Sequence, residues 1–229
     1  MNILIVGAGG REHAMAWKSN QNPKVKSLHV TPGNGGIEAL ANCWYLTDHK
    51  QIVAKALDEK IDLVLIGQED YSVNGLVELL EEKGIKVFGA SQKAARLEGS
   101  KVFAKEFMKK YDIPSAHFKA FSDYNQAVAF LDSMKAPYVL KADGLAAGKG
   151  VLICEDLESA KAGLKEILVD KAFGSAGNQV VIEEFMTGEE ASWFVFTDGK
   201  HYRSLPSLQD HKRQLELDKG LNTGGMGCY

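Results

Sequence analysis

Short apolar runs and amphipathic stretches alternate along the first part of the chain. The apolar runs, which are typical of buried parallel strands, occupy residues 2–6, 27–31, 63–66 and 86–88. Stretches with apolar residues at helical spacing lie between them, at residues 11–20, 47–60 and 73–83. Because strands and helices alternate at this spacing, the pattern predicts a doubly wound parallel α/β sheet.

The pattern changes in the second part of the chain. A charged helical pattern covers residues 91–111 and ends before Pro114, because a proline disfavours helix at the residue that precedes it. The other predicted elements are strands at residues 116–120, 179–185 and 191–197, and helices at residues 123–133 and 157–169. Ser122 is the expected N-cap of the helix that begins at residue 123. Together these elements predict an α+β unit with an antiparallel sheet.

A glycine-rich stretch, residues 141–150, lies between the apolar residues 138–140 and 151–153, which predicts the turn of a β-hairpin. Its glycines and lysines are Gly144, Gly148, Gly150, Lys141 and Lys149. Glycines let backbone N–H groups approach an anion, and the lysines add positive charge at both ends. The stretch therefore predicts a site for a nucleoside triphosphate. A solvated hairpin with surface lysines is the alternative interpretation.

This stretch is not a P-loop. A P-loop has Ser or Thr directly after its Gly-Lys pair, where this chain has Gly150. It also has a glycine five positions before the second one, where this chain has Asp143. Because the P-loop opens a helix and this stretch joins two strands, the phosphates would be held by another architecture.

The first turn of the parallel sheet, residues 7–10, is rich in glycine but fails the dinucleotide fingerprint. The fingerprint requires glycine at position 12, which is Glu12, and an acidic residue at the end of the second strand, which ends in Thr31-Pro32. A helix N-terminus that can hold a phosphate remains. Loops at residues 32–36 and 67–70 follow other strands of the sheet, so we expect them in the same crevice, with ordinary turns as the alternative.

An acidic cluster follows the predicted strand at residues 179–185. Its members are Glu183, Glu184, Glu189 and Glu190. Near a lysine-lined loop, such groups could accept hydrogen bonds from an adenine amino group or from ribose hydroxyls. A charged turn that keeps a strand edge soluble is the alternative.

Composition narrows the class of protein. The 229 residues include 27 basic and 30 acidic residues, which argues weakly against a nucleic-acid partner. The three cysteines lie far apart and show no zinc spacing, so we expect a reducing compartment and no disulfide framework. The N-terminal apolar run is too short for a signal peptide or a membrane span. We therefore expect a cytoplasmic protein with no membrane partner.

Several motifs in this order resemble the glycinamide ribonucleotide synthetase family of ATP-grasp enzymes, over residues 1–229. The motifs are residues 7–13 (GAGGREH), 32–35 (PGNG), 99–101 (GSK), 141–150, 183–185 (EEF), 209–213 (QDHKR) and 222–227 (NTGGMG). The resemblance implies a parallel α/β domain at residues 1–100, a helical connection at 101–115, an ATP-grasp lid subdomain at 116–187 and the start of a second ATP-grasp lobe at 188–229.

The resemblance also implies a reaction. Members of the family join glycine to 5-phosphoribosylamine, using ATP and Mg²⁺ or Mn²⁺, and form glycinamide ribonucleotide, ADP and phosphate in purine synthesis. Glycine's carboxylate is first phosphorylated, and the phosphoribosylamine nitrogen then attacks the acyl phosphate. No enzyme nucleophile is needed, which agrees with the absence of a nucleophile motif here. We expect a monomer with small molecules as its partners.

Site residues follow from the same resemblance. The predicted nucleotide-binding residues are Lys105, Lys141, Gly144, Gly148, Lys149, Gly150, Glu183, Glu184, Phe185, Met186 and Glu190. The predicted phosphoribosylamine-binding residues are Gly9, Gly10, Arg11, Glu12, His13, Gly33, Asn34, Gly35 and Glu69. Asp210, Lys212 and Arg213 are predicted to be catalytic, and with Thr223, Gly224, Gly225 and Met226 to line the glycine and acyl-phosphate end.

The chain departs from the family in two ways. Leucine stands within residues 214–221 where the family prefers proline, and the family continues for about as long again beyond Tyr229. The expected Mg²⁺ ligands lie in that further part, so weak activity of this chain alone is expected. Another ATP-grasp carboxylate-amine ligase and a non-catalytic nucleotide-binding module are the alternatives. We also expect the 141–150 loop to be a poorly ordered lid in the absence of nucleotide.

Overall fold

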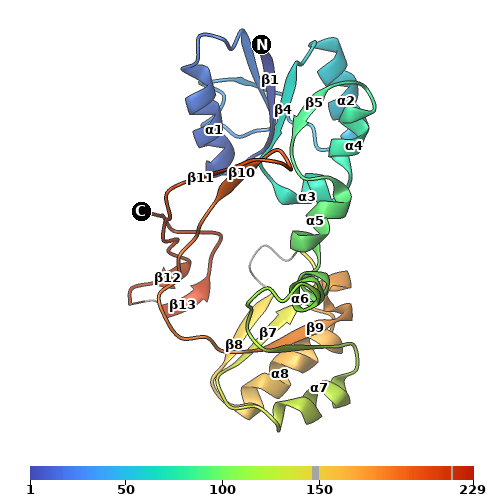
Figure 1. The fold of residues 1–229 in the computed structure, drawn as a ribbon, viewed down its shortest axis with the longest axis vertical. Coiled ribbons are helices and arrows are strands. Elements are labelled where there is room, and N and C mark those ends of the chain that lie inside the picture. Colours follow the sequence, from blue (N-terminus) through green and yellow to red (C-terminus); the bar gives the residue numbers. More distant parts are fainter. Residues whose placement is uncertain (146–149, 218) are drawn as a thin grey trace. The chain divides into compact units, whose positions relative to one another are not determined.

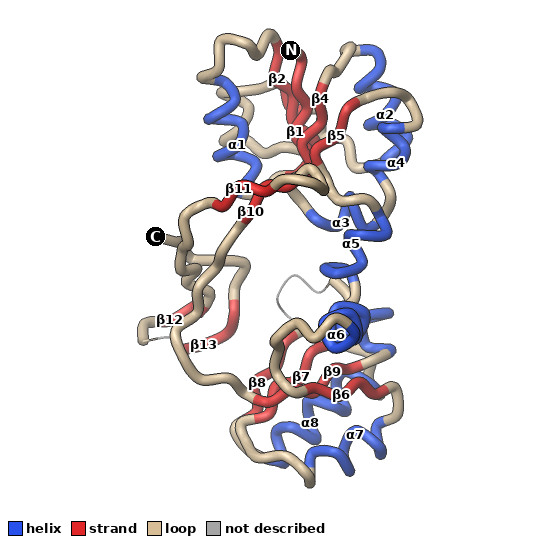
Figure 2. The backbone as a smooth tube through the Cα atoms, in the orientation of Figure 1, coloured by secondary structure: helices blue, strands red, loops and turns tan. Residues whose placement is uncertain are grey.

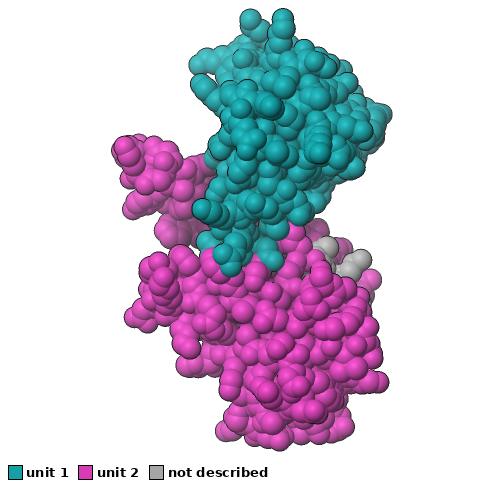
Figure 3. Space-filling model, turned by 90° about the vertical axis from the view of Figure 1, so that its right-hand side faces the viewer, with its two compact units in different colours: residues 1–99 teal, residues 100–229 magenta. Residues whose placement is uncertain are grey.

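The computed structural model of the chain describes residues 1–145, 150–217 and 219–229 (Figure 1). These residues form two compact units, residues 1–99 and residues 100–229 (Figure 3). The predicted nucleotide contacts of Gly148 and Lys149, and residues 146–149 of the predicted lid at 141–150, lie outside the described residues.

The first unit is built on the parallel sheet that the apolar runs predict. Its strands run in the order β3-β2-β1-β4-β5, and all neighbouring pairs are parallel. The strands are β1 (Asn2–Gly7), β2 (Ser27–Pro32), β3 (Asn42–Cys43), β4 (Leu63–Ile66) and β5 (Lys86–Phe88). The helices are α1 (Gly10–Asn20), α2 (His49–Asp58), α3 (Glu69–Val73), α4 (Leu76–Glu81) and α5 (Gln92–Gly99).

Alternate residues of the central strand β1 build two separate cores, because successive side chains of a strand point to opposite faces. Leu4 and Val6 pack with the cluster of α2 and α4, whereas Ile3 and Ile5 pack with Ala16 of α1. Figure 1 shows α1 on one face of the sheet and α2 and α4 on the other. The doubly wound architecture is thereby confirmed.

The second unit contains the predicted antiparallel sheet. Its strands run in the order β6-β9-β7-β8 and all pairs are antiparallel. The strands are β6 (Phe118–Phe121), β7 (Tyr138–Ala142), β8 (Val151–Cys154) and β9 (Val180–Glu184). The helices are α6 (Lys101–Lys110), α7 (Tyr124–Leu131), α8 (Leu157–Leu168) and the 3₁₀ helix η1 (Gly174–Asn178). Lys141 pairs with Val151, which confirms the predicted hairpin around the glycine-rich stretch.

Helices cover both faces of this sheet. Leu140 and Ile182 pack with Leu164 of α8 and Leu131 of α7 in one hydrophobic cluster. Figures 1 and 2 show α7 and α8 together on that face and α6 on the other. The face toward α6 carries polar side chains, which become the site described below.

Two hairpins follow the sheet. They pair β10 (Val195–Thr197) with β11 (Tyr202–Ser204), and β12 (Arg213–Leu215) with β13 (Lys219–Asn222). Wherever burial is described after Glu183, no residue is buried. Because two-stranded hairpins without a core are marginally stable in water, we expect these hairpins to be the least stable part of the second unit.

Several predicted element boundaries were wrong for identifiable reasons. The helix predicted at residues 91–111 is two helices, because Ser100 has an extended backbone and caps α6 with its side chain. The helix predicted at residues 73–83 begins only at Leu76, and Gly75 (φ +83°) separates it from α3. Asp123 rather than Ser122 caps α7, since its carboxylate accepts the Gln126 N–H.

Other differences concern short elements. Strand β3 has two residues, so it leaves no periodic signal in the sequence. The strand predicted at residues 191–197 is limited to Val195–Thr197. Among the described residues, no helix is long and apolar enough to cross a membrane.

Candidate functional site

Two lysines and a glutamate form a charged cluster on the α6 face of the second unit's sheet. Lys105 comes from α6, Lys141 from β7 and Glu183 from β9. The Oε2 atom of Glu183 lies 2.9 Å from Lys141 Nζ and 3.2 Å from Lys105 Nζ. The three side chains are 11%, 28% and 4% exposed for Lys105, Lys141 and Glu183.

Strand register explains this meeting. Val139 pairs with Glu183, and Lys141 lies two residues further along the same strand, so Lys141 and Glu183 share one face. Lys105 completes the group from the helix that covers this face, with its Nζ 5.6 Å from the ring centre of Phe118. The Oε1 atom of Glu183 is buried and accepts no hydrogen bond from a described residue. The cluster therefore combines two cations with one free acceptor.

The base of the glycine-rich stretch is tied to the N-terminus of α6. Ser100 Oγ donates to Asp143 Oδ1 at 3.0 Å. Asp143 Oδ1 also accepts the Val102 N–H at 3.1 Å. Lys101 Nζ donates to the Gly144 carbonyl at 2.8 Å. Sequence reasoning missed the roles of Ser100 and Asp143. The signal was present, because a serine three residues before Phe103 is a typical N-cap and the Phe103 N–H does bond to its side chain.

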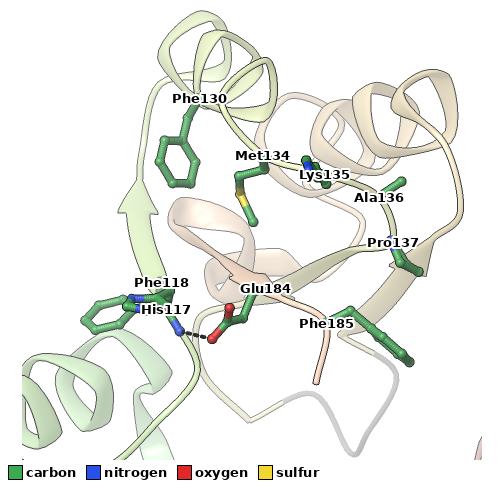
Figure 4. Close-up of a pocket in the computed structure, with 9 residues that line it drawn as sticks. All are labelled: His117, Phe118, Phe130, Met134, Lys135, Ala136, Pro137, Glu184 and Phe185. Atoms are coloured by element: carbon green, nitrogen blue, oxygen red, sulfur yellow. Dashed lines mark hydrogen bonds between the residues drawn. The ribbon is translucent and has the colours of Figure 1, made fainter. Parts of the chain in front are cut away.

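Glu183 and Glu184 point to opposite faces of the sheet, as neighbours on a strand do. Glu184 Oε1 accepts the His117 N–H at 2.9 Å, and the Glu184 N–H donates to the His117 carbonyl at 3.1 Å. Glu184 and Phe185 border a cavity of about 570 Å³ (Figure 4). Its other lining residues are His117, Phe118, Phe130, Met134, Lys135, Ala136 and Pro137. The predicted nucleotide-binding residues Phe185 and Met186 are both exposed.

In the first unit, three loops meet at the carboxyl edge of the sheet. Arg11 donates to the Gly67 carbonyl at 2.6 Å and lies 3.6 Å from Glu69 Oε2, which joins α1 to the loop after β4. Asn34 Nδ2 donates to the Ala8 carbonyl at 2.7 Å, which joins the loop after β2 to the loop after β1. The three loops predicted to share this edge of the sheet are therefore in contact with one another.

The predicted substrate residues in these loops differ in their surroundings. Gly10, the first residue of α1, and Gly35 have open space where a side chain would stand. Gly33 has a φ of +78° and packs against the Cys43 sulfur, so it shapes its loop. His13 lies against Gly36, 3.0 Å from the position that a Cβ would take there.

Glu12 differs from its neighbours in the motif, because its side chain is 1% exposed and turned into the unit. Its Oε2 atom accepts the Gly9 N–H at 2.6 Å, which satisfies one of the free donors at the N-terminus of α1. The structure thus places Glu12 beneath the loop, whereas the resemblance implies that it contacts the substrate.

The two C-terminal motifs lie side by side. The backbone N–H groups of Thr223 and Met226 donate to the carbonyls of Lys212 and His211 at 2.7 Å each. Thr223 Oγ1 also donates to the Lys212 carbonyl at 2.8 Å. The backbones of Asp210 and Cys228 form an isolated antiparallel β-bridge. The motifs at residues 209–213 and 222–227 therefore lie antiparallel to each other, and we call them the strap.

Charged side chains on this strap are paired. Lys212 forms an ion pair with Glu190, and its Nζ lies 4.0 Å from Asp210 Oδ2. Arg213 donates to the Gly220 carbonyl at 2.6 Å. Glu190, predicted to bind the nucleotide, thus lies with the predicted catalytic residues, while Gly224 and Gly225 form the turn that follows Thr223.

The described residues offer no metal site, and neither Cys43 nor Cys154 offers an activated thiol. No group of three or more His, Cys, Asp or Glu side chains in that part of the chain could hold a metal ion. Burial raises the pKa of the Cys43 thiol in the first unit and of the Cys154 thiol in the second, so neither is activated as a nucleophile.

The fold of this chain resembles that of solved structures with little sequence similarity to it. A solved biotin carboxylase from Campylobacter jejuni, in complex with β-γ-ATP, superimposes with a TM-score of 0.73 at 17% identity, over 93% of this chain and 52% of that one. At this identity the likeness concerns the fold alone. A parallel α/β unit followed by a unit with antiparallel strands is thus shared with an ATP-binding carboxylase.

The family follows from closer matches. Residues 1–98 match the phosphoribosylglycinamide synthetase N domain, and residues 99–229 match the ATP-grasp (A) domain of the same synthetase. The chain belongs to the phosphoribosylglycinamide synthetase family. The resemblance drawn from the motifs is confirmed.

Relatives agree with this assignment. The phosphoribosylamine–glycine ligases of Pasteurella multocida (strain Pm70) and Escherichia coli (strain K12) are 48% and 47% identical to this chain over 233 aligned residues. The crystal structure of the Thermotoga maritima ligase superimposes with a TM-score of 0.83 at 33% identity. The alignments cover 100% of this chain but 54% of each of the first two relatives and 55% of the third. The chain therefore spans about half the length of these relatives.

Proposed function

We propose that the chain provides the N-terminal part of an ATP-dependent ligase that joins glycine to 5-phosphoribosylamine. The products would be glycinamide ribonucleotide, ADP and phosphate, formed through a glycyl phosphate intermediate. The names of the ligases that it resembles support this proposal. A soluble, small-molecule enzyme that acts as a monomer in the cytoplasm is part of the same proposal.

The observation that carries the proposal is the meeting of Lys105 and Lys141 on Glu183. Two cations from different elements converge within 3.2 Å of one carboxylate oxygen in a poorly exposed site. The phosphate oxygens of a nucleotide could replace that carboxylate oxygen as the partner of both lysines. The second oxygen of Glu183, which has no donor among the described residues, would accept a hydrogen bond from the nucleotide. Glu184, Phe185 and Met186 would border the base.

The phosphoribosylamine is assigned to the carboxyl edge of the first unit. The N–H groups of Gly10 and Arg11 lie in the first turn of α1, where the helix dipole favours an anion. Gly35, in the loop after β2, has open space where a side chain would stand. The exposed Glu69 carboxylate could accept a hydrogen bond from a ribose hydroxyl. A phosphate monoester with a polyhydroxylated ring fits these groups.

Bond changes in the proposed reaction need no protein nucleophile. An oxygen of the glycine carboxylate bonds to the γ-phosphorus while the bond to ADP breaks. The amine nitrogen then attacks the acyl carbon, and the bond to phosphate breaks as the nitrogen gives up one proton, which leaves with the phosphate. Lys105 and Lys141 would neutralise phosphoryl oxygens. Asp210, Lys212 and Arg213, with residues 223–226, would position the glycine and the acyl phosphate. Mg²⁺, when bound, would neutralise further phosphate charge, and it is assigned to no residue of this chain.

Calorimetry with ATP tests the nucleotide site. We expect the chain to bind ATP, and K105A and K141A each to weaken binding by about tenfold or more, because each removes a charged donor. K109A, at an exposed position on the same helix as Lys105, is the matched control. Equal affinities of K109A, K105A and K141A would contradict the assignment. ADP release that requires both glycine and phosphoribosylamine would test the reaction itself.

A further inference from the structure

The carboxylate of Glu12 is buried without a full set of hydrogen bonds. Oε2 accepts the Gly9 N–H, whereas Oε1 accepts no hydrogen bond from a described residue. Burying a charged group in this way is costly unless the group is fully paired. A role in the site above it would account for a carboxylate at this position.

Glycines on two neighbouring strands make room for this side chain. A Cβ on Gly7 would stand 2.6 Å from Glu12 Cδ, and one on Gly67 would overlap Oε1. A Cβ on Gly9 would stand 3.1 Å from Oε2. Gly7 ends β1, and Gly67 follows the end of β4. The carboxylate therefore fills the space between two strand ends.

This space lies between β1 and β4, at the topological switch point, where the order in which the chain adds strands reverses. From β1 the chain continues through α1 to β2 on one side, and from β4 it continues through α3 and α4 to β5 on the other. Ligands of open parallel sheets bind at such a point. In dinucleotide-binding sheets the second glycine of the fingerprint lets the backbone approach the diphosphate, and the third, at the position of Glu12, lets the helix pack closely on the strand.

We propose that Glu12 is a specificity-determining residue that limits the N-terminus of α1 to a single phosphate monoester and excludes diphosphates. This inference rests on the proposed function, since it concerns the site assigned there to phosphoribosylamine. Three properties act together: the side chain occupies the space, its acceptor takes the Gly9 donor, and its charge opposes a second phosphoryl group.

The test compares ribose 5-phosphate with ribose 5-diphosphate on the 229-residue chain. Binding is followed by the amide chemical shifts of Gly9, Gly10 and Arg11, so that anions bound elsewhere are distinguished. For the unmodified chain we expect the monophosphate to bind at least about tenfold more tightly. For E12G the ratio should fall to about one, because both the obstacle and the charge are removed.

E12Q separates charge from shape, since glutamine fills the same space and can still accept the Gly9 N–H. We expect E12Q to bind both anions more tightly than the unmodified chain, and E81Q, at an exposed position on α4, to change neither affinity. An unchanged ratio in folded E12G, or unchanged affinities in E12Q, would overturn the role of Glu12 while leaving the substrate site in place. Absence of ribose 5-phosphate binding in the unmodified chain would overturn both proposals.

Discussion

At the scale of single residues, the described part of the second unit is distinguished by one buried carboxylate, that of Glu183. Glu183 is almost completely buried and has two lysines as partners, so its carboxylate stays favourable only while they remain. Glu184, the next residue, is exposed and bonds to a backbone N–H instead. The strand alternation that separates these two glutamates decides which of them meets the two lysines.

Replacing Glu183 by glutamine should lower the free energy of unfolding by about 3 kcal/mol, the low end for a broken buried ion pair, because Lys141 is partly exposed and can regain water. Urea denaturation measures the change. E189Q, at an exposed position, should alter the free energy by less than about 0.5 kcal/mol. Similar losses in both variants would show that the buried ion pair is not responsible.

Asp198 offers a pH-dependent test in the turn between β10 and β11. A hydrogen bond from the His201 side chain, followed by backbone N–H bonds from His201 and Lys200, lowers the pKa of Asp198 from 3.8 to about 2. Because the folded-state pKa is depressed, the stabilisation is present above about pH 4 and is lost as the pH falls through 2. In H201A the pKa should rise but stay below 3.8, since the backbone donors remain; an NMR titration of the carboxyl group that shows no rise would contradict this.

At the scale of elements, helix α6 contacts both the glycine-rich turn and the charged cluster around Glu183. Its N-cap Ser100 also bonds to Asp143, which begins the glycine-rich turn, and its body carries Lys105. Sequence periodicity predicted helix throughout residues 91–111, because the residues on both sides of Ser100 favour helix. The sequence contains the N-cap signal of Ser100, but the bond between Ser100 and Asp143, 43 residues apart, is visible only in the folded chain.

S100A should lower the free energy of unfolding by about 1 kcal/mol through the lost cap. It should also weaken ATP binding, because Asp143 loses a donor at the base of the turn. Urea denaturation and calorimetry give the two quantities. S122A is the matched control: Ser122 is not the cap of α7, so no comparable loss is expected. A greater loss in S122A would reverse the assignment of the caps.

At the scale of the whole molecule, the chain divides into units with different assigned ligands. The first unit carries the proposed phosphate site and the second carries the lysine cluster. The strap and hairpins after Glu183 have no buried residue where burial is described. Each part is therefore expected to respond separately to ligands.

Hydrogen exchange should show this separation. Saturating ATP, at about 100 times its dissociation constant, should stabilise the second unit by about 2.7 kcal/mol and slow exchange in β7 and β9. Ribose 5-phosphate should slow exchange at the start of α1 instead. Amides of the β10–β11 hairpin should exchange fastest, because no core protects them. Protection of both units by ATP alone would contradict the assignment of separate sites.

The sequence by itself determined the architecture and the family. Apolar runs of strand length and helical spacing depend on local periodicity, so the parallel sheet, the hairpin at residues 138–153 and the order of motifs could be predicted without coordinates. Family membership followed from seven motifs in order, each of which would be weak alone.

Tertiary structure decided which side chains meet. The contacts of Lys105 with Glu183, of Ser100 with Asp143 and of Lys212 with Glu190 join residues 78, 43 and 22 positions apart. Glu12 shows the limit most clearly: its sequence position identified it as a break in a fingerprint, but only the tertiary structure shows that its carboxylate is buried between Gly7 and Gly67. Such pairings depend on how strands align and which faces helices cover, and these are properties of the folded chain rather than of any short segment.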